Sequence, residues 1–290
     1  MKTIYKSLEG KERILNQYEE YLTQFDSLIR RDYIQTRYGS THVLVMGKKE
    51  GKPLFIFQGG NCINPVTLSW FKGLLGEYKV YAPDTIGHPG YSDETRISAS
   101  DSSFAEWIAD LMDHYRIEKC GFIGPSYGGG IILRLAAFMP ERIQCAILVA
   151  PAGICLGSKM KMIKEILVPM IFYKMNGSVK SLRKIADVMS SNSMKQLDES
   201  IIGNIFKHTT LEQEMPKLTV ANELRDYTAP TLVITGTEDV FFPGNKISQK
   251  TEGLLGEQLE LKQYQMGHFP STAHLEIIDI DIKEFLKNHY

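Results

Sequence analysis

A serine lies between two glycines in the segment Gly124-Pro125-Ser126-Tyr127-Gly128, after the apolar run KCGFI and before the helical pattern GGIILRLAAFM. A serine hydroxyl is a weak nucleophile at neutral pH, so an enzyme must expose it and place a base beside it. A sharp turn from strand to helix exposes the hydroxyl, and glycines on either side let the two backbones approach closely. The helix N-terminus also offers amide donors to a developing oxyanion. The pattern predicts Ser126 as a nucleophile.

The base is expected in a loop after a late strand, where an imidazole can reach over the sheet edge. His268 fits, because it follows the run LELKQYQ within Gly267-His268-Phe269-Pro270. Its nearest rival, His274, lies in the helical run STAHLEIIDI, and His88 lies in a loop ahead of the serine that could also border the pocket. The remaining four histidines occupy strand, helix or tail contexts without a nucleophile beside them and are interpreted as structural: His42, His114, His208 and His289.

The acid that orients the histidine is expected at the end of a strand between the serine and the histidine. The run PTLVITG ends at Gly236 and is followed by Glu238 and Asp239. The preceding strand, QCAILVA, is followed only by proline, alanine and glycine, which cannot serve as an acid. We favour Asp239 over Glu238 because it directly precedes the apolar segment VFFP.

Eight strand-like runs must position these groups: YIQTRY, THVLVMG, PLFIFQ, YKVYAP, KCGFIG, QCAILVA, PTLVITG and LELKQYQ. Several are apolar throughout, as expected for strands of a parallel sheet that is buried on both faces. Helical patterns separate them, and Ser103 with Glu106 is expected to form a capping box at the start of one. The sequence therefore predicts an α/β fold, with a mostly parallel central sheet flanked by helices.

A long helical interruption separates the strand after the nucleophile helix from the next strand. It carries KMKMIKEILVPMIFYKM, VKSLRKIADVMSS and ESIIGNIFKH, and seven of the chain's twelve methionines. It is too long for a structureless loop, so we interpret residues 153–227 as a helical cap. The core is expected at residues 33–152 and 228–290, and residues 1–32 are expected to form a helical extension. The pattern does not decide whether this extension packs on the sheet, covers the pocket or joins another subunit.

From about residue 33 to the C-terminus the chain resembles the α/β-hydrolase fold superfamily. The order Ser126, Asp239, His268 matches that family's order of nucleophile, acid and base. The segment FIFQGGNCINP resembles its oxyanion loop, with Gln58 in place of the common histidine. The segment APDTIGHPGYSD resembles its Asp-x-x-Gly-x-Gly-x-Ser motif through Asp84, Gly87, Gly90 and Ser92.

The resemblance implies that the N–H groups of Gly60 and Tyr127 form the oxyanion hole, with Asn61 as the alternative to Gly60. It implies a serine hydrolase that needs no cofactor and no metal, and that cleaves a small, mainly apolar carboxylic ester through an acyl-enzyme. Asn61, Phe241 and Met170 are expected to line the substrate pocket, within an apolar chamber to which Tyr127 and these cap residues contribute: Met162, Ile163, Ile166, Leu167, Ile171 and Phe172. The alternatives are a thioesterase, a carbon–carbon bond hydrolase, an acyltransferase, or a small-molecule receptor that retains the triad.

Whole-chain composition argues against a nucleic-acid-binding protein and against a membrane-spanning one. Thirty-three basic residues against 34 acidic ones give a net charge of −1, which does not favour nucleic acid or an anionic membrane as a partner. No apolar run approaches the roughly 20 residues that span a bilayer, and the N-terminus lacks the apolar core of a secretory signal. We therefore expect a cytoplasmic enzyme with a small-molecule substrate. Its four cysteines show no metal-binding spacing and are expected to be reduced core residues.

Overall fold

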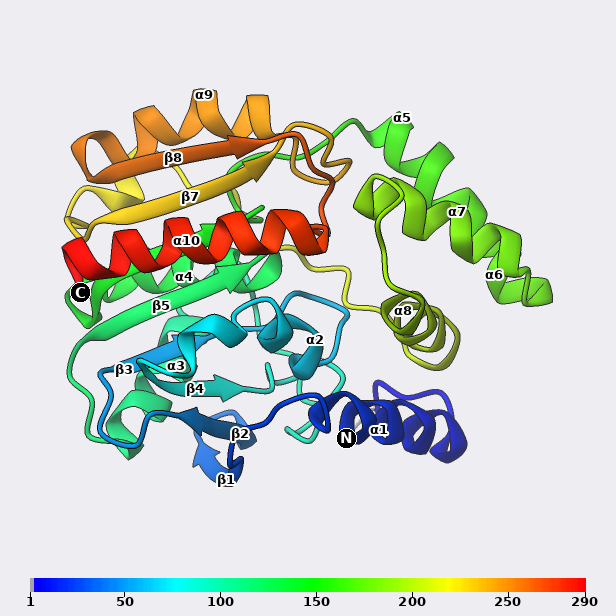
Figure 1. The fold of residues 1–290 in the computed structure, drawn as a ribbon, viewed down its shortest axis with the longest axis horizontal. Helices are drawn as coiled ribbons and strands as arrows, with labels where there is room; N and C mark the ends of the chain where they lie inside the picture. Colours follow the sequence, from blue (N-terminus) through cyan, green and yellow to red (C-terminus); the bar gives the residue numbers. More distant parts are fainter. Residues whose placement is uncertain (1–2) are drawn as a thin grey trace.

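The computed structural model describes residues 3–290. These residues form one eight-stranded sheet, with the order β1-β2-β4-β3-β5-β6-β7-β8, and the helices around it (Figure 1). The strand β2 is antiparallel to β1 and β4, whereas all pairs from β4 to β8 are parallel. The carboxyl ends of β3 to β8 therefore lie at one edge of the sheet. The strands are β1 (Arg30–Thr36), β2 (Gly39–Gly47), β3 (Pro53–Ile56), β4 (Lys79–Pro83), β5 (Cys120–Pro125), β6 (Ile143–Val149), β7 (Thr231–Gly236) and β8 (Leu259–Tyr264).

The predicted α/β class and all eight predicted strands are confirmed. The first strand begins at Arg30, three residues before the expected start, because Arg30 and Arg31 already pair with Val45 and Leu44 of β2. Because both arginines are charged and exposed, a search for apolar runs does not detect this part of the strand.

Helices cover both faces of the sheet. One apolar core joins the sheet to α3 (Ser103–His114), α4 (Tyr127–Phe138) and α9 (Gly244–Leu255), and a second joins its other face to α1 (Leu8–Leu22), α2 (Asn64–Ser69) and α10 (Thr272–His289). Burial on both faces explains why the central strands are apolar throughout. The four cysteines are buried free thiols, as expected.

The expected capping box of α3 is wrong. The helix begins at Ser103, so Ser102 is the residue at its N-cap, and the Asp101 carboxylate accepts a hydrogen bond from the Ser103 N–H at 2.9 Å. Glu106 accepts hydrogen bonds from the Ser102 and Tyr38 hydroxyls instead, at 2.7 and 2.6 Å. A neighbouring side chain from the β1–β2 turn thus competes for the carboxylate that local sequence assigns to the cap.

The N-terminal helix α1 connects the core with the segment between β6 and β7. Its buried Tyr18 donates a hydrogen bond to Asp84 Oδ1 at 2.8 Å, beyond the end of β4, and Tyr21 donates to Asp198 Oδ1 at 2.9 Å. The other Asp84 oxygen lies 2.9 Å from His42 Nδ1 in a fully buried pair. Because a buried carboxylate is costly without partners, this network fixes α1 against the sheet.

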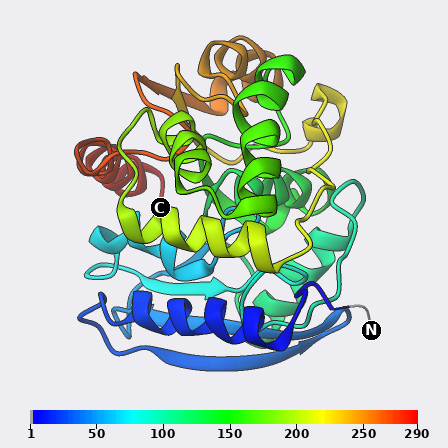
Figure 2. The same ribbon diagram turned by 90° about the vertical axis from the view of Figure 1, so that its right-hand side faces the viewer.

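Between β6 and β7 the chain forms four α-helices in front of the carboxyl edge of the sheet (Figure 2). These are α5 (Lys159–Met162), α6 (Val168–Asn176), α7 (Val179–Ser190) and α8 (Gln196–His208), and a π-helical turn at Ile163–Leu167 makes α5 and α6 continuous. We refer to residues 153–227 as the cap segment. An apolar cluster of its helices includes Val240 from the loop after β7, so the segment packs directly against that loop.

Candidate active site

Ser126 occupies a strained turn at the carboxyl end of β5. Its φ of 51° and ψ of −118° lie in a region that non-glycine residues rarely adopt. A Cβ on Gly124 would overlap the Gly128 backbone, and one on Gly128 would lie 2.6 Å from the Phe57 oxygen. Both positions therefore require glycine, and the half-buried serine is held between strand and helix as the motif predicts.

Asp239 and His268 meet at the same edge of the sheet. His268 Nδ1 lies 2.8 Å from Asp239 Oδ2, and both residues are buried. The other carboxylate oxygen accepts hydrogen bonds from the Phe241 and Phe242 N–H groups, at 2.7 and 3.0 Å. Since Nδ1 is engaged by the carboxylate, Nε2 is the nitrogen left for proton transfer.

The rival residues lie elsewhere. Glu238 accepts a hydrogen bond from Gln265 at 3.0 Å and does not pair with a histidine, while His274 Nδ1 lies 2.7 Å from Ser271 Oγ at the start of α10. Within residues 3–290, no hydrogen bond joins Ser126 Oγ to another group, His268 included. Such bonds are often long in ligand-free enzymes and tighten in the complex.

The loop that follows β3 lies directly over Ser126 and Tyr127. A Cβ placed on Gly59 would lie 3.9 Å from Ser126 Cβ, and one on Gly60 only 3.0 Å from Tyr127 Cβ. No hydrogen bond from the Gly60 or Tyr127 N–H is found within residues 3–290. Two free amide donors thus lie beside the serine, the arrangement that an oxyanion hole needs.

Buried polar contacts fix this loop. Gln58 is fully buried, donates to the Cys62 oxygen at 2.9 Å and accepts from the Thr85 N–H at 3.2 Å. The Gln58 side chain thus joins the loop after β3 to the loop after β4. Asn61 adopts a positive φ of 50° and exchanges two hydrogen bonds with the Glu212 backbone, at 3.0 and 2.7 Å.

The Asn61 N–H donates to His88 Nδ1 at 3.2 Å, which turns this amide away from the serine. Gly60, rather than Asn61, is therefore left with the free N–H. The His88 ring also contacts the Tyr127 ring, with centroids 4.7 Å apart. Burial, with a smaller contribution from Arg96, lowers the pKa of His88 from 6.5 to about 3, so the imidazole stays neutral and able to accept.

Comparison with known proteins agrees with this fold. The family model described as alpha/beta hydrolase fold matches residues 52–175, which include the loop after β3 and the turn at Ser126. The crystal structure of naproxen esterase from Bacillus subtilis is similar, with a TM-score of 0.81 at 20% identity, over 97% of this chain and 99% of that one. The protein therefore has the α/β-hydrolase fold.

Two curated proteins from Bacillus subtilis (strain 168) are similar to this chain in sequence. Carboxylesterase nap is 31% identical over 143 residues, which are 48% of this chain and 47% of that protein. Carboxylesterase YbfK is 26% identical over 148 residues, 51% of this chain and 50% of that one. The match thus spans about half the length of these relatives.

Apolar side chains surround His268. The Phe241 and Phe242 rings approach the His268 ring edge-on, with centroids at 5.0 and 5.5 Å. Half-buried Met170 packs with Phe241 on the apolar cluster that includes Val240. Tyr127 instead buries its ring against Phe104 and His88. Four cap residues expected to line an apolar chamber do not enclose one, because they are 40–52% exposed: Ile163, Leu167, Ile171 and Phe172.

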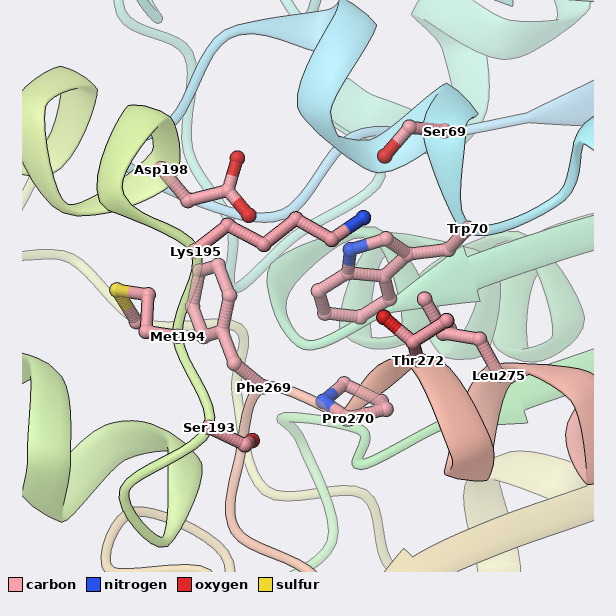
Figure 3. Close-up of a pocket in the computed structure, with 10 residues that line it drawn as sticks. All are labelled: Ser69, Trp70, Ser193, Met194, Lys195, Asp198, Phe269, Pro270, Thr272 and Leu275. Atoms are coloured by element: carbon pink, nitrogen blue, oxygen red, sulfur yellow. The ribbon is translucent and has the colours of Figure 1, made fainter.

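A small cavity lies beside the histidine loop, between α2, the α7–α8 connection and the start of α10 (Figure 3). Its volume of about 20 Å³ suits a single water molecule rather than a substrate. Its walls include Trp70 and Phe269, whose rings pack edge to face at 5.3 Å, and the Asp198 carboxyl, whose pKa is raised by burial.

The described residues contain no cluster of three or more histidine, cysteine or carboxylate ligands suited to a metal ion. None of the helices in residues 3–290 combines the length and the apolar character needed to span a bilayer.

The neutral state of His88 predicts a loss of stability in acid. Because its pKa is lowered on folding, the unfolded chain binds a proton below pH 6.5 while the folded chain does not until about pH 3. We expect this residue alone to cost about 2 kcal/mol of the free energy of unfolding between pH 7 and pH 5. Urea titrations of His88→Asn, which keeps an acceptor for Asn61, should show that much less acid sensitivity than the wild type. An equal loss in both proteins would contradict the prediction, and His114→Asn on the exposed end of α3 is the control.

Proposed function

We propose that the protein is a cofactor-free serine carboxylesterase for small, mainly apolar esters. The observation that carries the proposal is the buried pair of His268 Nδ1 and Asp239 Oδ2, 2.8 Å apart, at the sheet edge where Ser126 occupies its strained turn. The similarity to two carboxylesterases supports the same reaction class.

In the proposed reaction Ser126 Oγ attacks the ester carbonyl carbon while His268 Nε2 takes the hydroxyl proton. The Asp239 carboxylate stabilises the imidazolium that results. The N–H groups of Gly60 and Tyr127 donate to the oxyanion of the tetrahedral intermediate. His268 returns the proton to the leaving alcohol as the C–O bond breaks, which leaves an acyl group on Ser126. Water then attacks the acyl carbon while the same imidazole takes its proton. The bond from the acyl carbon to Ser126 Oγ breaks as the imidazolium returns that proton to Oγ, which releases the carboxylic acid and restores the serine.

The preference for an apolar acyl group rests on the surroundings of His268. Aromatic rings and the cluster with Val240 and Met170 border the imidazole, and the buried Asp239 carboxylate beside it already uses both oxygens. A charged substrate would lose its hydration there without finding a partner. The same apparatus can serve thioesters, carbon–carbon bonds and acyl transfer, but the relatives' activity favours the ester.

The direct test replaces the nucleophile. We expect Ser126→Ala to lower kcat/KM for p-nitrophenyl acetate by about a thousandfold or more, because no other side chain of the turn 124–128 offers a nucleophile in place of Ser126 Oγ. Ser200→Ala, on the exposed face of α8, should retain full activity. A Ser126→Ala enzyme with near-normal turnover would refute the proposal, as would a wild type that binds esters and is stabilised by them without cleaving them.

The role of the acid is tested by two adjacent isosteric changes. Asp239→Asn should keep the shape of the loop but lower kcat by several orders of magnitude, because an amide cannot stabilise the imidazolium and can favour the wrong tautomer. Glu238→Gln, which removes a charge one residue away, should leave kcat within about twofold of the wild type, since Glu238 is exposed and its carboxylate is bound by Gln265 and Ser191 rather than by His268. A larger loss from Glu238→Gln than from Asp239→Asn would reverse the assignment.

A further inference from the structure

The outer face of the cap segment is apolar and open to solvent. The continuous helix of α5, the π turn and α6 lies at the end of the molecule that is farthest from the sheet (Figures 1 and 2). One side of it packs on α7 and α8 through Ile166, Met170 and Tyr173. The other side and the start of α7 carry large apolar side chains that are 40–77% exposed: Met160, Ile163, Leu167, Val168, Ile171, Phe172, Met175 and Val179.

These exposed residues form a continuous surface rather than scattered contacts. Met160, Ile163, Leu167 and Ile171 recur at intervals of three and four, which places them on one side of the helix. The helix from Lys159 to Asn176 is about 27 Å long, and a contiguous apolar surface of that extent on a monomer usually marks an interaction site.

The segment that carries this face is strongly basic. Residues 159–184 contain seven lysines or arginines and one glutamate, a local net charge of +6 in a chain whose total is −1. Lys161 pairs with Glu165, and Arg183 pairs with Asp187 and Glu199. In the described part of the chain the other five cations of this segment form no ion pair: Lys159, Lys164, Lys174, Lys180 and Lys184. The balanced whole-chain charge therefore conceals a local cationic surface.

Basic and apolar groups share one groove on this face. An open groove of about 550 Å³ runs between α6 and α7, with Val168, Phe172 and Val188 beside Lys180 and Lys184. The one carboxylate among its lining residues, Asp187, is paired with Arg183. Apolar side chains flanked by lysines suit a surface in which negative head groups overlie acyl chains. A soluble polyanion such as a nucleic acid would satisfy the lysines but leave the apolar side chains in water.

We propose that the outer face of the cap, formed by residues 159–184 of α5, the π turn, α6 and α7, docks on an anionic lipid surface. The apolar side chains enter the boundary between head groups and acyl chains, and the lysines contact lipid phosphates. This face is connected to the candidate active site, because the Gly157 N–H just before α5 donates to the Phe241 oxygen at 2.7 Å. Docking thus places the loop with Asp239 on the side of the molecule that approaches the lipid.

Sedimentation with lipid vesicles tests the proposal. We expect the full chain to bind phosphatidylcholine vesicles that contain about one third phosphatidylglycerol, with at least about tenfold weaker partition into pure phosphatidylcholine. Raising the salt from about 50 mM to about 500 mM should weaken the binding by about tenfold, since it shortens the screening length.

Two double variants separate the apolar from the basic contribution. Ile171→Ser with Phe172→Ser, and Lys180→Gln with Lys184→Gln, should each lower the partition coefficient by about tenfold. Lys48→Gln with Lys49→Gln, in the exposed turn before β3, should not. Because these four cap positions are exposed, the thermal midpoint of each variant should stay near that of the wild type, which excludes misfolding as the cause.

Absence of binding, equal binding to both kinds of vesicle, or binding that neither cap variant weakens would overturn the proposal. Binding of a soluble polyanion such as heparin without binding of vesicles would overturn it in favour of a different partner. The measurement does not depend on catalysis, since Ser126→Ala should bind vesicles as the wild type does. Failure of the lipid proposal and failure of the esterase proposal are therefore distinguishable.

Discussion

The hydrogen bond between Asp239 and His268 sets the requirements that the rest of the site must meet. A buried carboxylate is stable only if its oxygens find donors, and here one oxygen takes two backbone N–H groups while the other takes the imidazole. The turn 239–242 and the loop after β8 must therefore keep a fixed separation, which the parallel pairing of β7 and β8 supplies. The orientation of His268, and with it the direction of Nε2, follows from that pairing and from the aromatic rings around it.

A second set of buried polar contacts fixes the position of the loop after β3, as the Asp239 carboxylate fixes the orientation of His268. Gln58 joins the loop to Thr85, His88 accepts the Asn61 N–H, and Asn61 in turn holds the backbone of Glu212. These bonds connect the loop after β3, the loop after β4 and the end of the cap segment. Because each bond is directional, the Gly60 N–H is oriented by contacts that come from three separate parts of the chain. The positive φ of Asn61 belongs to the same arrangement.

The fold and the turn at Ser126 could be predicted from the sequence because both depend on local patterns, whereas the catalytic roles of Ser126, Asp239 and His268 stay a prediction. The fully apolar runs predicted a sheet buried on both faces, and the Ser126 turn requires glycine at fixed positions. The network of Tyr18, His42 and Asp84 could not be predicted, since it joins a helix, the interior of β2 and the loop after β4, which are separated by up to 66 residues. The same limit explains the wrong capping box, because Glu106 is engaged by Tyr38 from another element. The basic face of the cap was missed for a different reason: whole-chain charge averages over regions of opposite sign.

The central claim is that Ser126 carries the acyl group during turnover. The most direct measurement mixes the enzyme with p-nitrophenyl acetate, quenches it in acid before the first turnovers are complete, and locates acetylated peptides by mass spectrometry. The account predicts one acetyl group per chain, on the peptide that contains Ser126, formed in step with an initial burst of p-nitrophenol. Turnover without any acetyl group on Ser126, or with the group on another residue that forms and decays at the catalytic rate, would contradict it.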